Sequence, residues 1–474
     1  MSSAIIGLAI AGFVLFLVLK PKVKALIAFF LMMQFMDIAP NILFGMYVWD
    51  YGAMLMLVIG VEVFLRRPVV PPAKHAYMTV LWVFLAWLTI CFFWSLLVYR
   101  YPIGHTIKSA RYMVLGYFMT PIFVRLFSVD PSAFEFLMKW IYRMTLVLMP
   151  VIVLQYVLQR PLLFGLVREY EGTLRVVPIF LPFCILNFWI IAAKSLSSEK
   201  LAVHESIYLL LALTTIALSF TRGIYFAVFL TGGLLVLLMS RDGRLKASAF
   251  LKLSAALILL IGLLFATGVA QKVGERALSG LHLISSDDSE GRHQKDDTFS
   301  GRLGLAGERF SMAWAQNPLL GYGFIHEDDV PSSVRSGLKY GTVLGGTAAD
   351  PEAYSRTYEF TSQFVLGFYT SDIAWADIVI TTGWVGVLLV IALVVTFALE
   401  HLLTRDAEHP MGYAVRTGLF LQVLMMFVLT FDGNNFYGAV HILAFLFAGY
   451  SLTRPRGVRI PAAPARARPA NVLT

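Results

Sequence analysis

Long runs of apolar residues alternate with short polar connections along most of the chain. A helix needs about 20 mostly apolar residues to cross the hydrocarbon core of a membrane, and most of the runs have about this length. We predict helices at 4–19, 25–43, 47–65, 77–98, 109–127, 136–158, 176–193, 206–220, 224–240, 250–269, 377–399, 414–430 and 436–452. The pattern predicts an all-α polytopic membrane protein of about 12–13 transmembrane helices, because the run 206–220 is short and the run 109–127 contains Arg111.

The composition supports a membrane protein. Hydrophobic residues make up 58% of the 474 residues and charged residues only 14%, whereas a soluble protein carries about 25% charged residues. Cys91 and Cys184 both lie inside apolar runs, so we interpret them as small core residues and not as a disulfide. The net charge of +9 indicates orientation in the membrane and not nucleic-acid binding, because the basic residues lie between the apolar runs.

Lysine and arginine residues are concentrated in every second connection and in the C-terminal tail. The intervening short connections contain only Arg100, Lys108, Arg111, Arg160, Arg168, Arg175 and Arg222. The positive-inside rule therefore places the basic connections and the C-terminus in the cytoplasm. The first run has no charged segment or cleavage site before it, so we expect a retained helix and not a signal peptide.

The predicted helices divide the chain into four segments. Residues 1–269 hold the first ten helices, 270–376 form a long extracytoplasmic loop, 377–453 hold the last three helices and 454–474 form a disordered cytoplasmic tail. The loop is too long for a passive connector, so we expect a lid or a binding element. Within it, residues 302–316 predict an amphipathic helix that ends before Asn317–Pro318.

Arg222 is the first candidate for chemistry. It stands between two apolar runs, in the sequence Ser219-Phe220-Thr221-Arg222-Gly223. An arginine close to the membrane is retained when it has a partner or a polar cavity. It equally suits an interfacial residue that reaches the lipid headgroups. Position alone leaves both interpretations open.

Arg302 and Arg309 form a second candidate pair in the predicted loop helix. They lie two helical turns apart, so we expect both guanidinium groups on one face, about 10 Å apart along the axis. Phe310, Ala313 and Trp314 then form the face that packs on the membrane helices. Arginine binds phosphate in a bidentate manner, so the pair suits a pyrophosphate. An ordinary solvated helix face is the alternative.

Asp372 is the third candidate, just before the run 377–399. A carboxylate at this position suits a general base acting on a sugar hydroxyl, and it equally suits a helix cap. Asp377 competes for either role.

Other motifs predict neither a metal site nor a cofactor. His326-Glu327-Asp328-Asp329 contains metal-ligand types, but consecutive residues in a loop seldom converge on one ion. No Walker, GxSxG or Rossmann sequence occurs in the chain. We interpret Gly321-Tyr322-Gly323 as a turn of the backbone after the loop helix.

Three blocks of sequence resemble the O-antigen ligase/polymerase (Wzy_C-type) family. The central block combines Ser300-Gly301-Arg302-Leu303 with Trp314 and the segment NPLLGYGF at 317–324. Residues 219–223 resemble the upstream Ser-x-x-Arg-Gly element of the family. Asp372 through Gly386 resembles the segment that enters the helix after the long loop. The resemblance covers residues 205–400, including the order of the blocks and their topology.

The resemblance implies a GT-C-like fold and an inverting, metal-independent glycosyl transfer from a polyprenyl-pyrophosphate-linked glycan. Arg222 and Arg302 would hold the pyrophosphate and stabilise its developing charge, with Arg309 as an accessory contact. Asp372 would be the base or would orient the acceptor. The family's ligases have a histidine where this sequence has Asp372, which favours a polymerase over a lipid A ligase.

We therefore expect polymerisation of a cell-surface or exported polysaccharide at the outer face of the bacterial inner membrane. The expected partners are a lipid-linked oligosaccharide donor and acceptor, membrane lipid, a chain-length regulator and a flippase, but not nucleic acid. One alternative is a ligase that transfers a finished glycan to lipid A core or to protein. The other is a non-catalytic transporter, although the sequence shows no paired halves.

Overall fold

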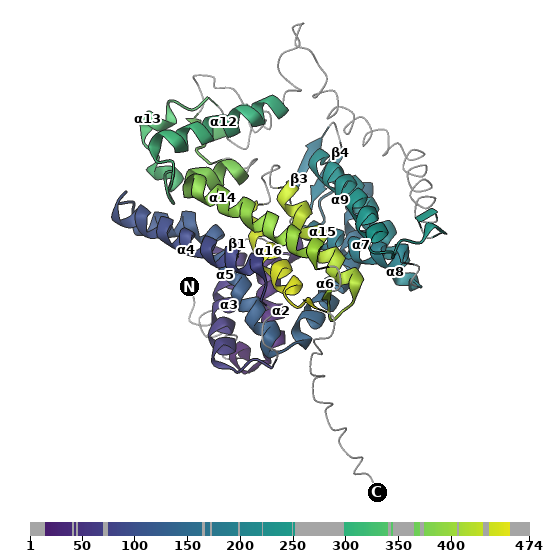
Figure 1. Ribbon diagram of the computed structural model, residues 1–474. Helices are drawn as coiled ribbons and strands as arrows, with labels where there is room; N and C mark the ends of the chain where they lie inside the picture. Colours follow the sequence, from purple (N-terminus) through teal and green to yellow (C-terminus); the bar gives the residue numbers. More distant parts are fainter. Residues whose placement is uncertain are drawn as a thin grey trace.

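The computed structural model describes residues 15–39, 42–43, 46–69, 74–163, 166–170, 173–197, 200–219, 221–248, 250–251, 298–339, 343–344, 365–369, 374–404, 407–429 and 436–455. These residues form an all-α polytopic membrane protein, as the apolar runs predict. Figure 1 shows the helices packed around one another, with α12 and α13 lying beside α14 at one end.

The longer elements follow the predicted runs closely. The helices are α2 (Pro21–Met32), α3 (Val48–Leu65), α4 (Ala76–Leu97), α5 (Ile103–Val129), α6 (Ser132–Leu158), α7 (Leu181–Leu196), α8 (Val203–Leu218), α9 (Arg222–Arg241), α12 (Thr298–Gln316), α13 (Ser332–Arg335), α14 (Ala374–Leu403), α15 (Tyr413–Leu429) and α16 (Phe436–Tyr450), with 3-10 turns η1 (Gln34–Asp37) and η2 (Glu327–Asp329).

Short antiparallel strand pairs connect some of the described helices. The pairs are β1 (Ile42–Leu43) with β2 (Met46–Tyr47), β3 (Leu166–Tyr170) with β4 (Thr173–Val177), β5 (Val343–Leu344) with β6 (Val365–Leu366), and β7 (Ala407–Glu408) with β8 (Arg454–Pro455). The longest pair, β3 with β4, sets Arg168 opposite Arg175. It occupies a connection in which the sequence analysis predicts no strand, and it delays the start of the helix predicted at 176 to Leu181.

Within the described residues, five helices are long and apolar enough to cross a membrane, namely α3, α4, α6, α9 and α14. A sixth is α5, which bends by 54° between Ile103–Arg111 and Met113–Val129. Shorter apolar helices lie within α7, α8, α15 and α16. Most of the predicted first and tenth helices fall outside the described residues, so the total of 12–13 stays a prediction.

The second apolar run does not form the single helix predicted over 25–43. α2 ends at Met32, and the whole of η1 has positive φ, from 48° to 66°. The buried Asp37 carboxylate accepts a hydrogen bond of 2.6 Å from the backbone N–H of Ile179. A buried carboxylate needs such a partner, and the turn at η1 accompanies this contact. The prediction of one helix was wrong because the apolar average concealed Gln34 and Asp37.

Aromatic rings fill the centre of the helix bundle. The ring of Phe445 in α16 lies 5.1 Å from Phe29, 5.7 Å from Phe123 and 5.5 Å from Phe134, measured between centroids. These partners come from α2, α5 and α6, so one side chain connects four helices. Tilted and edge-on aromatic pairs of this kind are favourable beyond the area that they bury.

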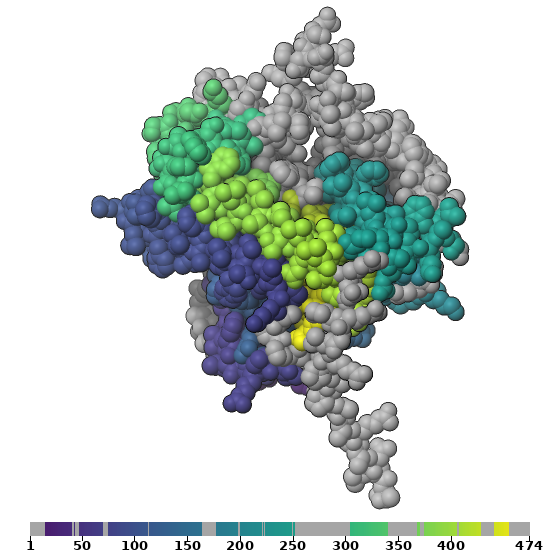
Figure 2. All heavy atoms as spheres, viewed as in Figure 1, coloured from purple at the N-terminus to yellow at the C-terminus, as the bar shows by residue number. Residues whose placement is uncertain are grey.

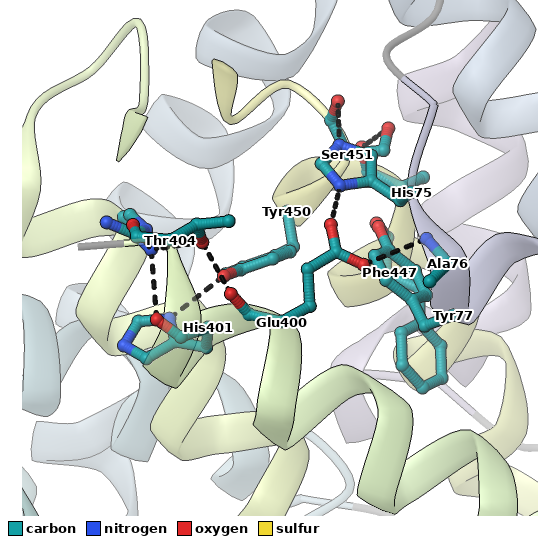
Figure 3. Close-up of polar contacts among 11 residues, drawn as sticks. His75, Ala76, Tyr77, Glu400, His401, Thr404, Phe447, Tyr450 and Ser451 are labelled. Carbon is teal, nitrogen blue, oxygen red and sulfur yellow. Dashed lines mark hydrogen bonds and ion pairs between the residues drawn. The ribbon is translucent and has the colours of Figure 1, made fainter. Parts of the chain in front are cut away.

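A polar network surrounds the C-terminal end of α14 (Figure 3). The Glu400 carboxylate forms an ion pair with His75 and accepts a 3.0 Å hydrogen bond from the backbone N–H of Ala76. One turn further, Thr404 and His401 offer their backbone carbonyls to the buried Arg416 guanidinium, at 2.6 and 3.2 Å. Arginine stabilises a helix C-terminus in this way, so charged side chains anchor this end of α14.

Candidate active site

The loop helix α12 packs along the N-terminal part of α14 (Figure 1). The ring centroids of Phe310 and Trp384 are 4.9 Å apart, and Ala313 is fully buried. Trp314 reaches the same tryptophan edge-on at 6.1 Å but keeps 64% of its surface exposed. α12 includes the predicted helix 302–316 and ends at Gln316, before Asn317–Pro318. The face predicted to pack on the membrane helices therefore does so.

Arg309 does not share a solvent-facing side of α12. It is fully buried, and its Nε and Nη2 atoms donate hydrogen bonds to the carbonyls of Phe368 at 2.9 Å and Gly367 at 3.1 Å. It also forms an ion pair with Glu308. Burial lowers the pKa of Arg309, and the neighbouring Glu308 carboxylate opposes that shift. The expected exposed face at Arg309 was wrong, because the side chain holds the segment that leads into α14.

The turn after α12 fits against a kink in α14. Gly383 interrupts the helix with φ 64° and ψ −169°. At the kink, the Trp384 N–H donates to the carbonyl of Pro318 at 2.9 Å. The Tyr322 N–H donates to the carbonyl of Ile380 at 2.7 Å. The loop thus satisfies backbone groups that the kink leaves without helical partners.

Gly321 makes this close approach possible. Its φ is 61°, a conformation that favours glycine, and an added Cβ would lie 2.3 Å from the carbonyl oxygen of Ile380. The interpretation of Gly321-Tyr322-Gly323 as a backbone turn is confirmed.

The same turn is also held by α4. The Ser95 hydroxyl accepts a 2.8 Å hydrogen bond from the Phe324 N–H, and the Tyr99 hydroxyl donates to the carbonyl of Gly321 at 2.8 Å. The Trp87 indole donates to the carbonyl of Thr382 at 2.9 Å, next to the kink. Figure 2 shows the resulting continuous surface, in which α12 and α13 adjoin α14 and α14 adjoins α4. The sequence analysis did not identify these α4 residues, because they lie in an ordinary apolar run.

Glu327 organises the chain just before α14. Its carboxylate accepts hydrogen bonds from the backbone N–H groups of Phe368 at 2.8 Å and Tyr369 at 3.3 Å. It also pairs with Arg335 at 3.2 Å. The Tyr369 hydroxyl donates to the carbonyl of Ile325 at 2.5 Å. Residues on both sides of the Gly321-Tyr322-Gly323 turn therefore position the chain up to Tyr369.

Asp372 itself lies outside the described residues, between Tyr369 and Ala374. Asp377, which competes for its predicted roles, is 1% exposed in the first turn of α14. It interacts electrostatically with Arg309 and Tyr369. A buried carboxylate facing a buried arginine suits charge compensation, so the structure gives Asp377 a structural setting.

Arg222 and Arg302 are described by their backbones alone. Arg222 begins α9, and Arg302 lies in the first turns of α12. The turn before Arg222 is tight, since Ser219 and Thr221 are buried and the Tyr225 hydroxyl donates to the carbonyl of Ala217 at 2.5 Å. The N-terminus of a helix attracts anions through its free N–H groups and its dipole. The backbone around Arg222 therefore suits a phosphate.

An apolar pocket lies between α9, α14 and α15. It has a volume of about 310 Å³ and is lined by Leu230, Leu234, Trp375, Val394 and Phe427, among others. Leu230 stands about 12 Å along α9 from Arg222, at 1.5 Å per residue, and Trp375 lies in the first turn of α14. Apolar pockets of this kind accept aliphatic chains. The pocket thus adjoins two of the sequence blocks that carry the resemblance.

One cluster was missed entirely. His105, near the start of α5, stacks on His326 with ring centroids 4.7 Å apart. It also contacts Asp329 at 2.9 Å. The sequence analysis considered His326 to Asp329 alone, and nothing in the sequence signalled that a histidine so distant along the chain would join them.

The arrangement agrees with a comparison with known families. The family model described as O-antigen ligase (Wzy_C) matches residues 207–391, which contain α9, α12 and the kink of α14. Among curated proteins, no match to the chain was found. The family match confirms the resemblance seen in the sequence: through residues 207–391, the chain carries the domain of the O-antigen ligase/polymerase family.

Proposed function

We propose that the chain polymerises a cell-surface or exported polysaccharide from polyprenyl-pyrophosphate-linked units. The family match indicates a membrane glycosyltransferase-like enzyme of the ligase/polymerase type. The proposal rests on one structural observation. The Pro318 to Phe324 turn, α12 and the kinked α14 interlock, and α14 shares an apolar pocket with α9, the helix that begins at Arg222.

The donor lipid occupies the apolar pocket in this proposal. The first part of its polyprenyl chain lies between α9, α14 and α15, where the lining is almost wholly aliphatic and aromatic. The pyrophosphate lies beyond the pocket, towards the N-terminus of α9. There Arg222 and Arg302 bind its oxygens, assisted by the backbone N–H groups of the helix terminus. Arg309 takes no direct part, because its donors are engaged by the Phe368 and Gly367 carbonyls.

The transfer is a single displacement with inversion and needs no metal. A hydroxyl of the acceptor sugar attacks the anomeric carbon of the donor, and the bond from that carbon to the pyrophosphate oxygen breaks. Asp372 accepts the hydroxyl proton. The two arginines stabilise the charge that develops on the departing polyprenyl pyrophosphate. Because the reacting groups gather at the loop side of α9 and α14, we place this face outside the bacterial inner membrane, with the C-terminus in the cytoplasm.

A ligase remains the second candidate, since the matching family model carries that description. The two reactions share the donor and differ in the acceptor. Asp372, which replaces the histidine of the ligases, supports the polymerase.

The test is a deletion strain of the source organism. Surface and secreted glycans are separated on gels, and lipid-linked intermediates are measured by mass spectrometry. Loss of long polymer, with single repeat units left on the carrier, supports a polymerase. Full-length polymer retained on the carrier identifies a ligase instead.

Complementation then tests the arginines. Arg302→Ala and Arg222→Ala should fail to restore polymer while reaching normal levels in the membrane. Arg160→Ala is the matched control, because Arg160 is exposed and lies outside the matched residues 207–391. Normal polymer from Arg302→Ala cells would contradict the assigned binding of pyrophosphate.

A further inference from the structure

Three metal-ligand side chains meet where the long loop touches the start of α5. His105, His326 and Asp328 each offer one ligand atom, and these atoms all lie within 4.8 Å of one another. The two imidazole rings stack with an interplanar angle of 28°. His105 comes from a membrane helix, whereas the other two come from the loop just after the Gly321-Tyr322-Gly323 turn. The cluster therefore joins two parts of the chain.

A fourth residue orients His105. Both carboxylate oxygens of Asp329 lie 2.9 Å from its Nδ1 atom. With Nδ1–H donated to this carboxylate, the lone pair of the ring remains on Nε2. A carboxylate behind a ligating histidine is a recurrent arrangement in protein metal sites, where it sets the tautomer and raises the basicity of the ring. His105 is thus prepared as a neutral nitrogen ligand.

The spacing within the loop also suits coordination. The Nδ1 atom of His326 and a carboxylate oxygen of Asp328 are 3.2 Å apart. Neighbouring ligands of a tetrahedral zinc ion, bound at about 2.0–2.2 Å, stand roughly 3.4 Å apart. The widest separation in the cluster must therefore shrink by about 1 Å or more. Asp328 has the freedom for this, because its side chain is 73% exposed.

We propose that His105, His326 and Asp328 bind a divalent cation of the zinc class, with Asp329 orienting His105. Two imidazoles and one carboxylate are the donors that zinc and neighbouring transition metals favour. Calcium and magnesium prefer all-oxygen sites, so the histidines select against them. A fourth position is left for water.

The bound cation fastens the loop to α5. Glu327 lies between two of these residues and holds the backbone of Phe368 and Tyr369. Fixing η2 on α5 therefore also fixes the chain that leads into α14. The site takes no part in the glycosyl transfer proposed above, and its occupancy does not depend on that proposal.

The test measures metal binding by the full chain in detergent micelles or nanodiscs, with any histidine tag removed. The protein is stripped with a chelator and titrated with Co²⁺, whose visible absorption reports its coordination, and then with Zn²⁺ as competitor. We expect one tight Co²⁺ per chain, displaced by Zn²⁺. His326→Ala should abolish this binding, and Asp329→Asn should weaken it by about 10- to 100-fold.

His204→Ala is the matched control, since His204 is an exposed histidine at the start of α8. It should bind as the wild type does. Equal binding by the wild type and by the double variant His105→Ala/His326→Ala would overturn the proposal, as would a wild type that binds no Co²⁺. If the histidine variants do not fold, Asp328→Asn decides the matter, because this exposed side chain can change without loss of the core, and unchanged affinity would refute the site.

Discussion

Gly383 and Leu319 approach so closely that a Cβ atom on the glycine would lie 2.0 Å from the Leu319 carbonyl oxygen. This contact joins the kink of α14 to the turn that follows α12. The two segments are distant in the sequence, and each supplies hydrogen-bond partners that the other lacks. The candidate active site is therefore built on a backbone contact.

Replacing Gly383 with alanine should separate these segments. The added methyl group meets backbone atoms, and the backbone angles at this position are nearly restricted to glycine, so we expect a loss of about 3 kcal/mol in the free energy of unfolding. Thermal unfolding of the purified protein measures the effect. Gly233→Ala is the control, because Gly233 lies within α9 with no atom near its added Cβ, and alanine is the better helix former. Equal melting temperatures for the two variants would contradict the contact.

Arg309→Ala should damage the fold and not the chemistry. The change leaves the carbonyls of Gly367 and Phe368 without their donors and Glu308 without its cation, at a cost of about 3–5 kcal/mol. We expect less folded protein in the membrane and a matching fall in polymer. Arg302→Ala is expected to show the opposite pattern, with normal protein and no polymer. Immunoblots and glycan gels on the same cells distinguish the two, and normal protein levels for Arg309→Ala would be evidence against its structural role.

Asp372→Asn should reduce polymer formation by about 100-fold or more, the usual contribution of a general base. Asp372→His should recover part of the activity, because imidazole also accepts a proton. Asp377→Asn provides the comparison, since its buried carboxylate interacts with Arg309 and its loss should lower the amount of folded protein. Rates are measured with lipid-linked donor in membranes that contain known amounts of the enzyme. Full activity of Asp372→Asn would transfer the role of base to another group.

Filling the apolar pocket should weaken donor binding. Leu234→Trp places a larger side chain between α9 and α14, and we expect KM for the lipid-linked donor to rise about tenfold while kcat changes little. This result is typical of an interaction made equally in the ground and transition states. Leu237→Trp serves as control, because Leu237 is 67% exposed on α9 and lies outside the pocket lining. Equal KM values for the two variants would exclude the pocket as the donor site.

The sequence predicted those features that depend on neighbouring residues. The end of α12 could be predicted because Asn317 and Pro318 terminate a helix locally, and the glycine turn could be predicted because Gly321 tolerates positive φ. The break after Met32 was missed because its buried partner, Ile179, belongs to another part of the chain. The burial of Arg309 was missed for the same reason, since its carbonyl partners lie beyond the following loop.

The site was predicted unevenly on the same grounds. The family blocks identified Arg222, Arg302 and Asp372 as candidates from their local sequence. Ser95, Tyr99 and His105 contribute through contacts that only the folded chain creates. No periodicity or local motif distinguishes such residues from ordinary helix positions.

The two ends of α14 differ in what they tolerate. At the kink, the partners are backbone atoms, so the fit is sensitive to shape and indifferent to the charge of nearby side chains. At Glu400, the partners are charged and polar side chains, so that end is sensitive to charge and forgiving of shape. Substitutions that adapt the loop to another sugar can therefore accumulate beside the kink without disturbing the anchor at the opposite end of the helix.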